Sequence, residues 1–179
     1  MTTTEWIVAV GGGLIAPFLL ATLIGLMLPR QRVATRSVKL KQRPESVWAT
    51  IIAIDRLPGW WPLCLMVESQ SDHDGRPVYR QTFRNGRRLQ HLSLEVVEAI
   101  EPTRFVTRIA DPKNRFLGRW VQQIETLPEG GCRLTLSEHS ETPNPLIRTL
   151  SRLMLGNAQF IDSYLFCLGR KFGEPVTPE

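Results

Sequence analysis

Glu138 is the side chain in this sequence whose position best suits acid–base chemistry. It follows Leu134 and Leu136 at two-residue spacing, so a regular strand turns all three side chains to one face. Burial on that face would raise the pKa of the carboxyl group and let it donate or accept a proton. The more ordinary role of such a carboxylate is to end a strand, where it pairs with an arginine or caps the next segment.

Each of these two roles needs different partners. Tyr79 and His91 are the residues that would complete an acid–base site with Glu138. Arg80, Arg84 and Arg119 are the cations that could instead hold it in an ion pair. Alternation along the strands does not choose between the two sets, so both interpretations stay open.

Trp60 and Trp61 form a second feature with functional potential, because they stand in a segment with two prolines and a glycine, DRLPGWWP. Indole rings offer a large contact area with one polar atom. The pair suits the mouth of an apolar pocket, a filled core or contact with a bilayer interface. If a pocket exists, we expect these residues to line it: Trp60, Trp61, Tyr79, Phe83, Leu94, Trp120, Leu136, Phe160 and Tyr164.

Established catalytic and cofactor motifs are missing from the chain. The sequence has no G-x-S-x-G, no P-loop and no H-E-x-x-H, and its three histidines are far apart. Its three cysteines have neither the paired spacing of a disulfide framework nor that of a zinc site. The sequence therefore predicts reduced thiols, no metal and no cofactor.

The elements that would position these residues can be read from the apolar spacing. Residues 33–40 predict a strand, Pro44 begins a helix, and residues 55–62 break it. Alternating segments then predict antiparallel strands at 66–69, 78–84, 87–98, 104–110, 116–127 and 132–139. One long amphipathic helix is expected from Pro145 to Gly173, packed on the sheet, with a disordered tail after it.

The N-terminal segment, residues 6–28, contains twenty-three residues without a charge. As a helix it would extend ~35 Å, enough to cross a bilayer core of ~30 Å. A cleaved signal peptide and a buried core helix are the less favoured alternatives, since no Lys or Arg precedes the segment. The sequence thus predicts a single transmembrane helix.

Basic residues are concentrated directly after that segment. Of the 22 Lys and Arg residues, six lie between positions 30 and 43, which leaves 16 against 17 acidic residues elsewhere (22 − 6 = 16). Such a flank predicts an inner-membrane protein with its N-terminus outside and its following domain in the cytoplasm. Arg30, Arg32 and Arg36 would contact anionic lipid. A near-neutral domain argues against nucleic-acid binding.

Several segments together resemble the START-like (SRPBCC) helix-grip superfamily, in its polyketide cyclase/dehydrase and lipid-transport branch. They are SVKLKQRPESVWATI, LPGWWP, GRWVQQIETLPEGGCRLTLSEHSE and the closing NPLIRTL to RKFGE. The resemblance covers about residues 33–173. It implies an α+β fold in which a curved antiparallel sheet wraps around a long C-terminal helix and leaves a cavity for a hydrophobic ligand.

The expected organisation is an anchor at residues 1–29 and a helix-grip domain at 30–179. The functional hypothesis is a membrane-tethered domain that binds a lipid or another hydrophobic small molecule. The alternative is a cyclase/dehydrase-like enzyme that uses Glu138 in the same cavity. A structural role in a membrane complex is a third possibility.

Overall fold

The computed structural model describes residues 17–85, 88–110, 117–154 and 159–179. A helix over residues 17–27 comes first. The other elements are β1 (Gln31–Leu40), α2 (Pro44–Ile52), the 3-10 helix η1 (Ile54–Gly59), β2 (Cys64–His73), β3 (Arg76–Asn85), β4 (Arg88–Ile100), β5 (Arg104–Ala110), β6 (Leu117–Thr126), β7 (Cys132–Glu141), α3 (Pro145–Met154) and α4 (Gln159–Lys171).

The seven strands form one antiparallel sheet in the order β1-β7-β6-β5-β4-β3-β2. Strand β7 shows why the sequence folds this way. Its residues Cys132, Leu134 and Leu136 are buried, while the polar residues between them are partly exposed. Two-residue alternation of this kind gives the sheet one apolar face. The predicted antiparallel sheet and C-terminal helix are therefore confirmed.

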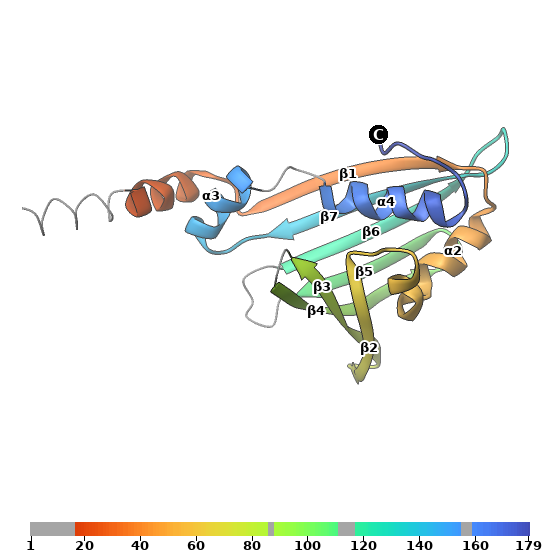
Figure 1. The fold of residues 1–179 in the computed structure, drawn as a ribbon, viewed down its shortest axis with the longest axis horizontal. Helices are drawn as coiled ribbons and strands as arrows, with labels where there is room; N and C mark the ends of the chain where they lie inside the picture. The colour runs from red at the N-terminus through yellow and green to blue at the C-terminus, as the bar shows by residue number, and fades with distance from the viewer. Residues whose placement is uncertain (1–16, 86–87, 111–116, 155–158) are drawn as a thin grey trace, which may run out of the picture.

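Helices α2 and α4 lie on the apolar face of the sheet, which we call the inner face (Figure 1). Pro44 occupies the first turn of α2, where its missing N–H costs no hydrogen bond. The apolar residues of α2 pack on the sheet, with the ring of Trp48 6.0 Å from that of Phe105. Helix α4 buries Ile161 and Leu165 in the same core.

The C-terminal region differs from the prediction in two respects. The described parts of the predicted helix are α3 and α4, with residues 155–158 outside the described ranges, and α3 lies beyond the end of β1 and β7 rather than on the sheet (Figure 1). The tail is also ordered, because the backbone of Glu179 exchanges two hydrogen bonds with Ser37 at the free edge of β1. The carboxylate of Glu174 accepts hydrogen bonds from Lys41 N and Gln42 Nε2. The expected tail disorder was wrong.

The predicted membrane anchor is not supported. No helix in the described ranges is both long enough and apolar enough to cross a membrane. Residues 6–16 of the predicted span lie outside the described residues. The described part of that span is the helix over residues 17–27, which is not such a helix. The predicted single-pass location, with its N-terminus outside and its domain in the cytoplasm, is therefore wrong.

The helix over residues 17–27 is instead packed against α3. The guanidinium of Arg148 donates to the carbonyl oxygens of Gly25 and Leu28, and Thr149 Oγ1 donates to Ala21 O. At Gly25 the carbonyl of Pro145 leaves no room for a side chain. These contacts require close backbone approach, which explains the small residues on this side of the helix.

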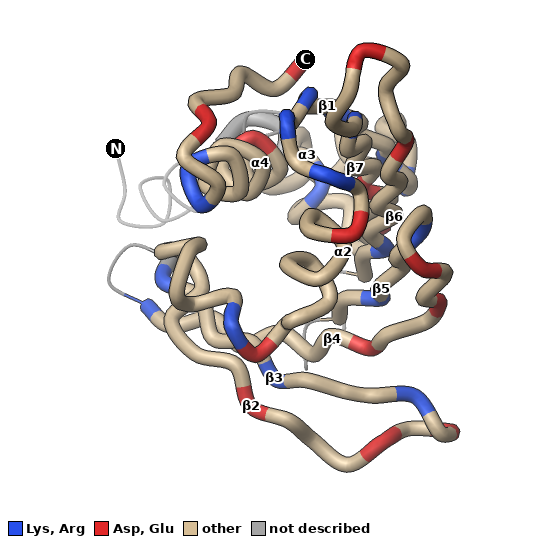
Figure 2. The backbone as a smooth tube through the Cα atoms, turned by 90° about the vertical axis from the view of Figure 1, so that its right-hand side faces the viewer, with Lys and Arg blue, Asp and Glu red and all other residues tan. Residues whose placement is uncertain are grey.

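Much of the basic run after this helix forms β1, as the predicted strand at residues 33–40 required. Arg36 Nε lies 3.1 Å from Asp162 Oδ1 of α4. Arg36 thus joins an edge strand to the C-terminal helix. Figure 2 shows Lys and Arg positions on other strands as well, including β3 and β5. No contact between Arg30, Arg32 or Arg36 and a lipid is shown.

Candidate ligand-binding site

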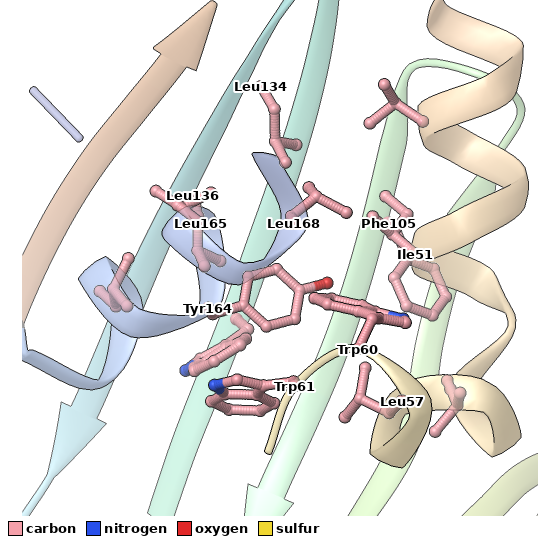
Figure 3. Packing of buried hydrophobic residues seen from close by; sticks show 14 of the residues in the cluster. Ile51, Leu57, Trp60, Trp61, Phe105, Leu134, Leu136, Tyr164, Leu165 and Leu168 are labelled. Carbon is pink, nitrogen blue, oxygen red and sulfur yellow. The ribbon is translucent and has the colours of Figure 1, made fainter. Parts of the chain in front are cut away.

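An aromatic cluster fills the space between the inner face and α4, with Trp61 at its centre (Figure 3). The centroid of the Trp61 ring lies 4.8 Å from that of Phe160, 5.1 Å from Tyr164 and 5.4 Å from Phe83. Trp120 of β6 packs 5.3 Å from Tyr164. Most of these pairs are edge-to-face, a favourable geometry for aromatic rings. Trp61 is only 1% exposed, so it belongs to the core.

A small cavity remains beside this cluster, with a volume of about 30 Å³. That volume suits a single water molecule, whereas ligand pockets usually measure about 300–1,000 Å³. The aromatic rings therefore occupy the space that a ligand would need. The cavity wall is formed by Ile51, Ile54, Leu57, Trp61, Gln81, Phe83, Leu92, Leu94, Phe105, Thr107, Ile109, Trp120, Gln122, Phe160 and Tyr164.

Four polar side chains converge on this otherwise apolar cavity: Gln81, Thr107, Gln122 and Tyr164. All four are buried. The Tyr164 hydroxyl donates to Gln122 Oε1 at 3.1 Å, and burial raises the pKa of the phenol. Buried polar groups are costly without hydrogen-bond partners. These four side chains together form a buried polar patch within the apolar interior.

Trp60 and Trp61 direct their indole N–H groups to different environments. Trp61 Nε1 donates to Ser163 Oγ at 3.2 Å, which ties the segment before β2 to α4. Trp60 packs 5.1 Å from the Tyr164 ring, and its buried Nε1 has no hydrogen-bond partner among the described residues. Sequence analysis left three roles for Trp60 and Trp61: the mouth of a pocket, a filled core or contact with a bilayer. In the structure both are core residues.

Comparison with known proteins now identifies the fold family. Residues 31–159 match the family described as polyketide cyclase / dehydrase and lipid transport. The chain belongs to this family. A search of curated proteins finds no sequence that matches the chain.

Solved structures of low sequence identity share the fold of this family member. Ara h 8.0201 aligns with a TM-score of 0.60 at 13% identity, covering 80% of this chain and 99% of its own. The Zhui aromatase/cyclase from Streptomyces sp. R1128 gives 0.60 at 14% identity, with coverage of 79% and 96%. The protein TTHA0849 from Thermus thermophilus gives 0.59 at 20% identity, with coverage of 79% and 95%. At such identities the likeness establishes the fold alone.

Of the nine residues expected from the sequence to line a pocket, six form the cavity wall. They are Trp61, Phe83, Leu94, Trp120, Phe160 and Tyr164. The other three do not reach it: Trp60 and Leu136 are buried elsewhere in the core, and Tyr79 is half-buried at its edge. The polar residues were missed, although Gln81 has the alternation of Phe83, and Gln122 that of Trp120. Strand alternation could have found both.

The predicted acid–base set is not assembled. Glu138 is on the inner face, in register with Trp120 and Ala34, and burial raises the pKa of its carboxyl group while Arg32 lowers it. Tyr79 is four strands away along the sheet order. His91 points to the opposite face, where its Nδ1 lies 3.0 Å from Thr82 Oγ1.

The thiols and carboxylates of the described residues form no metal centre. Within the described ranges, no three His, Cys, Asp or Glu side chains could together hold a metal ion. Cys64 and Cys132 are buried free thiols, and burial raises the pKa of each to about 11. Such thiols stay protonated at neutral pH and are poor nucleophiles.

Proposed function

We propose that the chain binds a hydrophobic small molecule, a lipid or an aromatic compound, between the inner face and α4. The observation that carries this proposal is the cavity wall, where aromatic and aliphatic side chains surround a convergent set of buried amide and hydroxyl groups. An apolar interior with a few placed polar groups is the usual composition of a small-molecule site. Membership of the family supports the same function.

Binding must displace part of the aromatic cluster, because the cavity has a volume of only about 30 Å³. Phe160 is the most readily displaced ring, since it stands in the first turn of α4 and is only partly buried. The Trp61–Ser163 hydrogen bond also links Trp61 to α4. A ligand would then select an open minor state, and its apparent affinity is reduced by the fraction of molecules that are open.

The test compares two phenylalanines of α4. Phe160→Ala removes a ring from the cavity wall, whereas Phe166→Ala removes one that is 45% exposed on the same helix. The probe is the uncharged fluorophore N-phenyl-1-naphthylamine. We expect Phe160→Ala to bind it about tenfold more tightly than wild type, because each aromatic pair it loses contributes about 0.5–1.5 kcal/mol to the closed state. Phe166→Ala should match wild type.

Failure of the probe to bind either wild type or Phe160→Ala would overturn the proposal. Native mass spectrometry of the purified full chain then addresses the natural ligand. A bound species that is lost on organic extraction, and whose mass identifies a lipid or an aromatic compound, is the expected result.

A second candidate function is catalysis on a hydrophobic substrate, and one observation favours it. Glu138 is on the inner face with a raised pKa, as a proton-transfer carboxyl requires. Its predicted partners are not beside it, so the substrate would have to supply the second polar group. Glu138→Gln should then abolish turnover of a bound substrate without weakening its binding. Unchanged turnover in this variant would remove the enzyme hypothesis.

A further inference from the structure

An open groove lies on the outer face of the sheet, the face opposite α2 and α4. Its volume is about 670 Å³, within the range of ligand pockets. Strand alternation shows on which face of the sheet the groove lies. Arg119 and Val121 flank the inward-facing Trp120, so their side chains point outward. The groove is lined by Gln31, Val33, Arg104, Arg108, Leu117, Gly118, Arg119, Val121, Gln123, Ser137, His139, Ser140 and Glu141.

Two arginines and a histidine form a row across this groove. Arg108, Arg119 and His139 occupy paired positions on β5, β6 and β7, so neighbouring members of the row are directly opposite one another. The opposed like charges of Arg119 and Arg108 destabilise a sheet unless something compensates them. The groove lining contains one acidic residue, Glu141, which is in register with Leu117 at the end of the groove rather than with the arginines.

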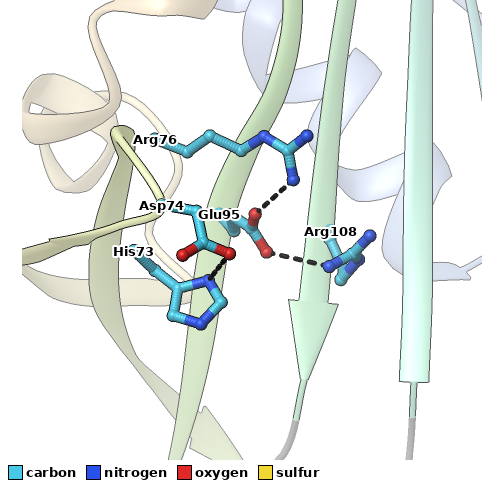
Figure 4. Close-up of polar contacts among 5 residues, drawn as sticks. All are labelled: His73, Asp74, Arg76, Glu95 and Arg108. Atoms are coloured by element: carbon cyan, nitrogen blue, oxygen red, sulfur yellow. Dashed lines mark hydrogen bonds and ion pairs between the residues drawn. The ribbon is translucent and has the colours of Figure 1, made fainter.

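The two arginines of β5 are already oriented by acidic partners on β4. Arg108 Nη1 lies 3.1 Å from Glu95 Oε2, while the other Glu95 oxygen accepts from Arg76 at 3.0 Å (Figure 4). Arg104 Nε lies 3.2 Å from Glu98 Oε1. Each guanidinium has five N–H donors, so these contacts leave donors for a ligand.

Arg119 is in a different situation. Its side chain makes no ion pair or hydrogen bond with a residue in the described ranges, and it is exposed. It stands between Arg108 and His139 in the row, so an anion placed at Arg119 is also close to the charge of Arg108. A guanidinium binds carboxylate, sulfonate and phosphate groups through paired hydrogen bonds.

We propose that this groove is a second binding site, for an amphipathic organic anion. Its acidic group binds Arg119 and Arg108, and its apolar body lies on Val33, Leu117 and Val121. Val33 is 59% exposed, which leaves an apolar surface beside the cations. Glu141 repels the acidic group from its end of the groove and so fixes the direction of the ligand. The inference does not depend on the proposed function of the inner face.

The test uses the full chain, labelled with ¹⁵N, and two probes of the same shape. Naphthalene-2-sulfonate carries the negative charge, and naphthalene-2-sulfonamide does not. We expect the sulfonate to shift the amide resonances of Arg119, His139 and Leu117. Arg119→Gln should weaken it about tenfold, the effect of one charge-assisted hydrogen bond of about 1.4 kcal/mol.

Arg80→Gln is the matched control, because Arg80 is an exposed arginine of β3 outside the groove. Its affinity for the sulfonate should stay within twofold of wild type. Equal losses of sulfonate affinity in both variants would mean that the effect comes from the overall charge of the protein, and would overturn the proposal. So would equal binding of the sulfonamide, no binding of the sulfonate, or shifts confined to the inner-face residues Thr107 and Gln122.

Discussion

The two faces of the sheet carry opposite kinds of site. On the inner face, aromatic rings close almost all of the space and surround buried polar groups, leaving about 30 Å³. On the outer face, arginines and small apolar side chains border an open groove of about 670 Å³. The difference follows from what covers each face: α2, η1 and α4 press on the inner one, while the groove is open. The inner site must open to bind, whereas the outer one is already formed.

The largest expected effect is a difference in stability between a substitution on the inner face and one on the outer face. Trp61→Ala removes the centre of the aromatic cluster and should lower the free energy of unfolding by about 3–5 kcal/mol. Val33→Thr keeps a β-branched side chain on the outer face and should change it by less than about 0.5 kcal/mol. Urea unfolding followed by circular dichroism measures both. Similar losses for the two variants would mean that the inner cluster is not the stabilising core.

A smaller effect on stability is expected from changes in the buried polar patch of the inner face. Tyr164→Phe removes the donor to Gln122 and leaves a buried amide oxygen unpaired, which should cost about 1–3 kcal/mol. Adding Gln122→Leu removes the unpaired amide oxygen as well, so the double variant should recover part of the lost stability. Unfolding measurements on both variants give the result. Strictly additive losses would show that the two side chains do not depend on each other.

On the outer face, Glu95 should matter more than Glu98. Glu95→Gln weakens two ion pairs of a carboxylate that is largely buried, and should cost about 1–2 kcal/mol. Glu98→Gln on the same strand weakens one more exposed pair and should cost less than about 0.5 kcal/mol. Thermal unfolding of the two variants is the comparison. A larger loss in Glu98→Gln would contradict the role of Glu95 in orienting Arg108.

The smallest effect concerns pH and Glu138. Burial raises the pKa of this carboxyl above its ordinary 4.5, so the folded protein binds its proton more tightly than the unfolded chain. Its contribution to stability is present below pH 4.5 and is lost as the pH rises through the folded-state pKa. Glu138→Gln should therefore flatten the stability profile above pH 4.5. A profile parallel to that of wild type would show that Glu138 is solvated like a surface carboxylate.

Local alternation accounts for what the sequence could predict. The spacing of Leu134, Leu136 and Glu138 was enough to place β7 and its inward face, and the same spacing marks Gln122 beside Trp120. Whether a cavity stays open or closes depends on contacts between distant segments, such as the ring of Phe160 against that of Trp61. No periodicity encodes those contacts.

The N-terminal segment shows the complementary failure. Hydropathy counts apolar residues but not their partners, so an uncharged run predicts a membrane span whether or not protein lies beside it. Here Ala21 and Gly25 accept hydrogen bonds from Thr149 and Arg148 of α3. The polar residues of α3 that bind this helix are more than a hundred positions away in the sequence. Only the tertiary structure brings the two segments together.

On our proposals, the inner face opens for a neutral hydrophobic ligand, whereas the outer groove does not take one. Titration of the ¹⁵N-labelled full chain with N-phenyl-1-naphthylamine distinguishes the two faces. We predict that the indole N–H resonances of Trp61 and Trp120 shift with saturation, while the side-chain Nε–H resonance of Arg119 stays in place. Saturation with unchanged Trp61 and Trp120 resonances, or with shifts at Arg119 instead, would show that the ligand does not enter the inner face.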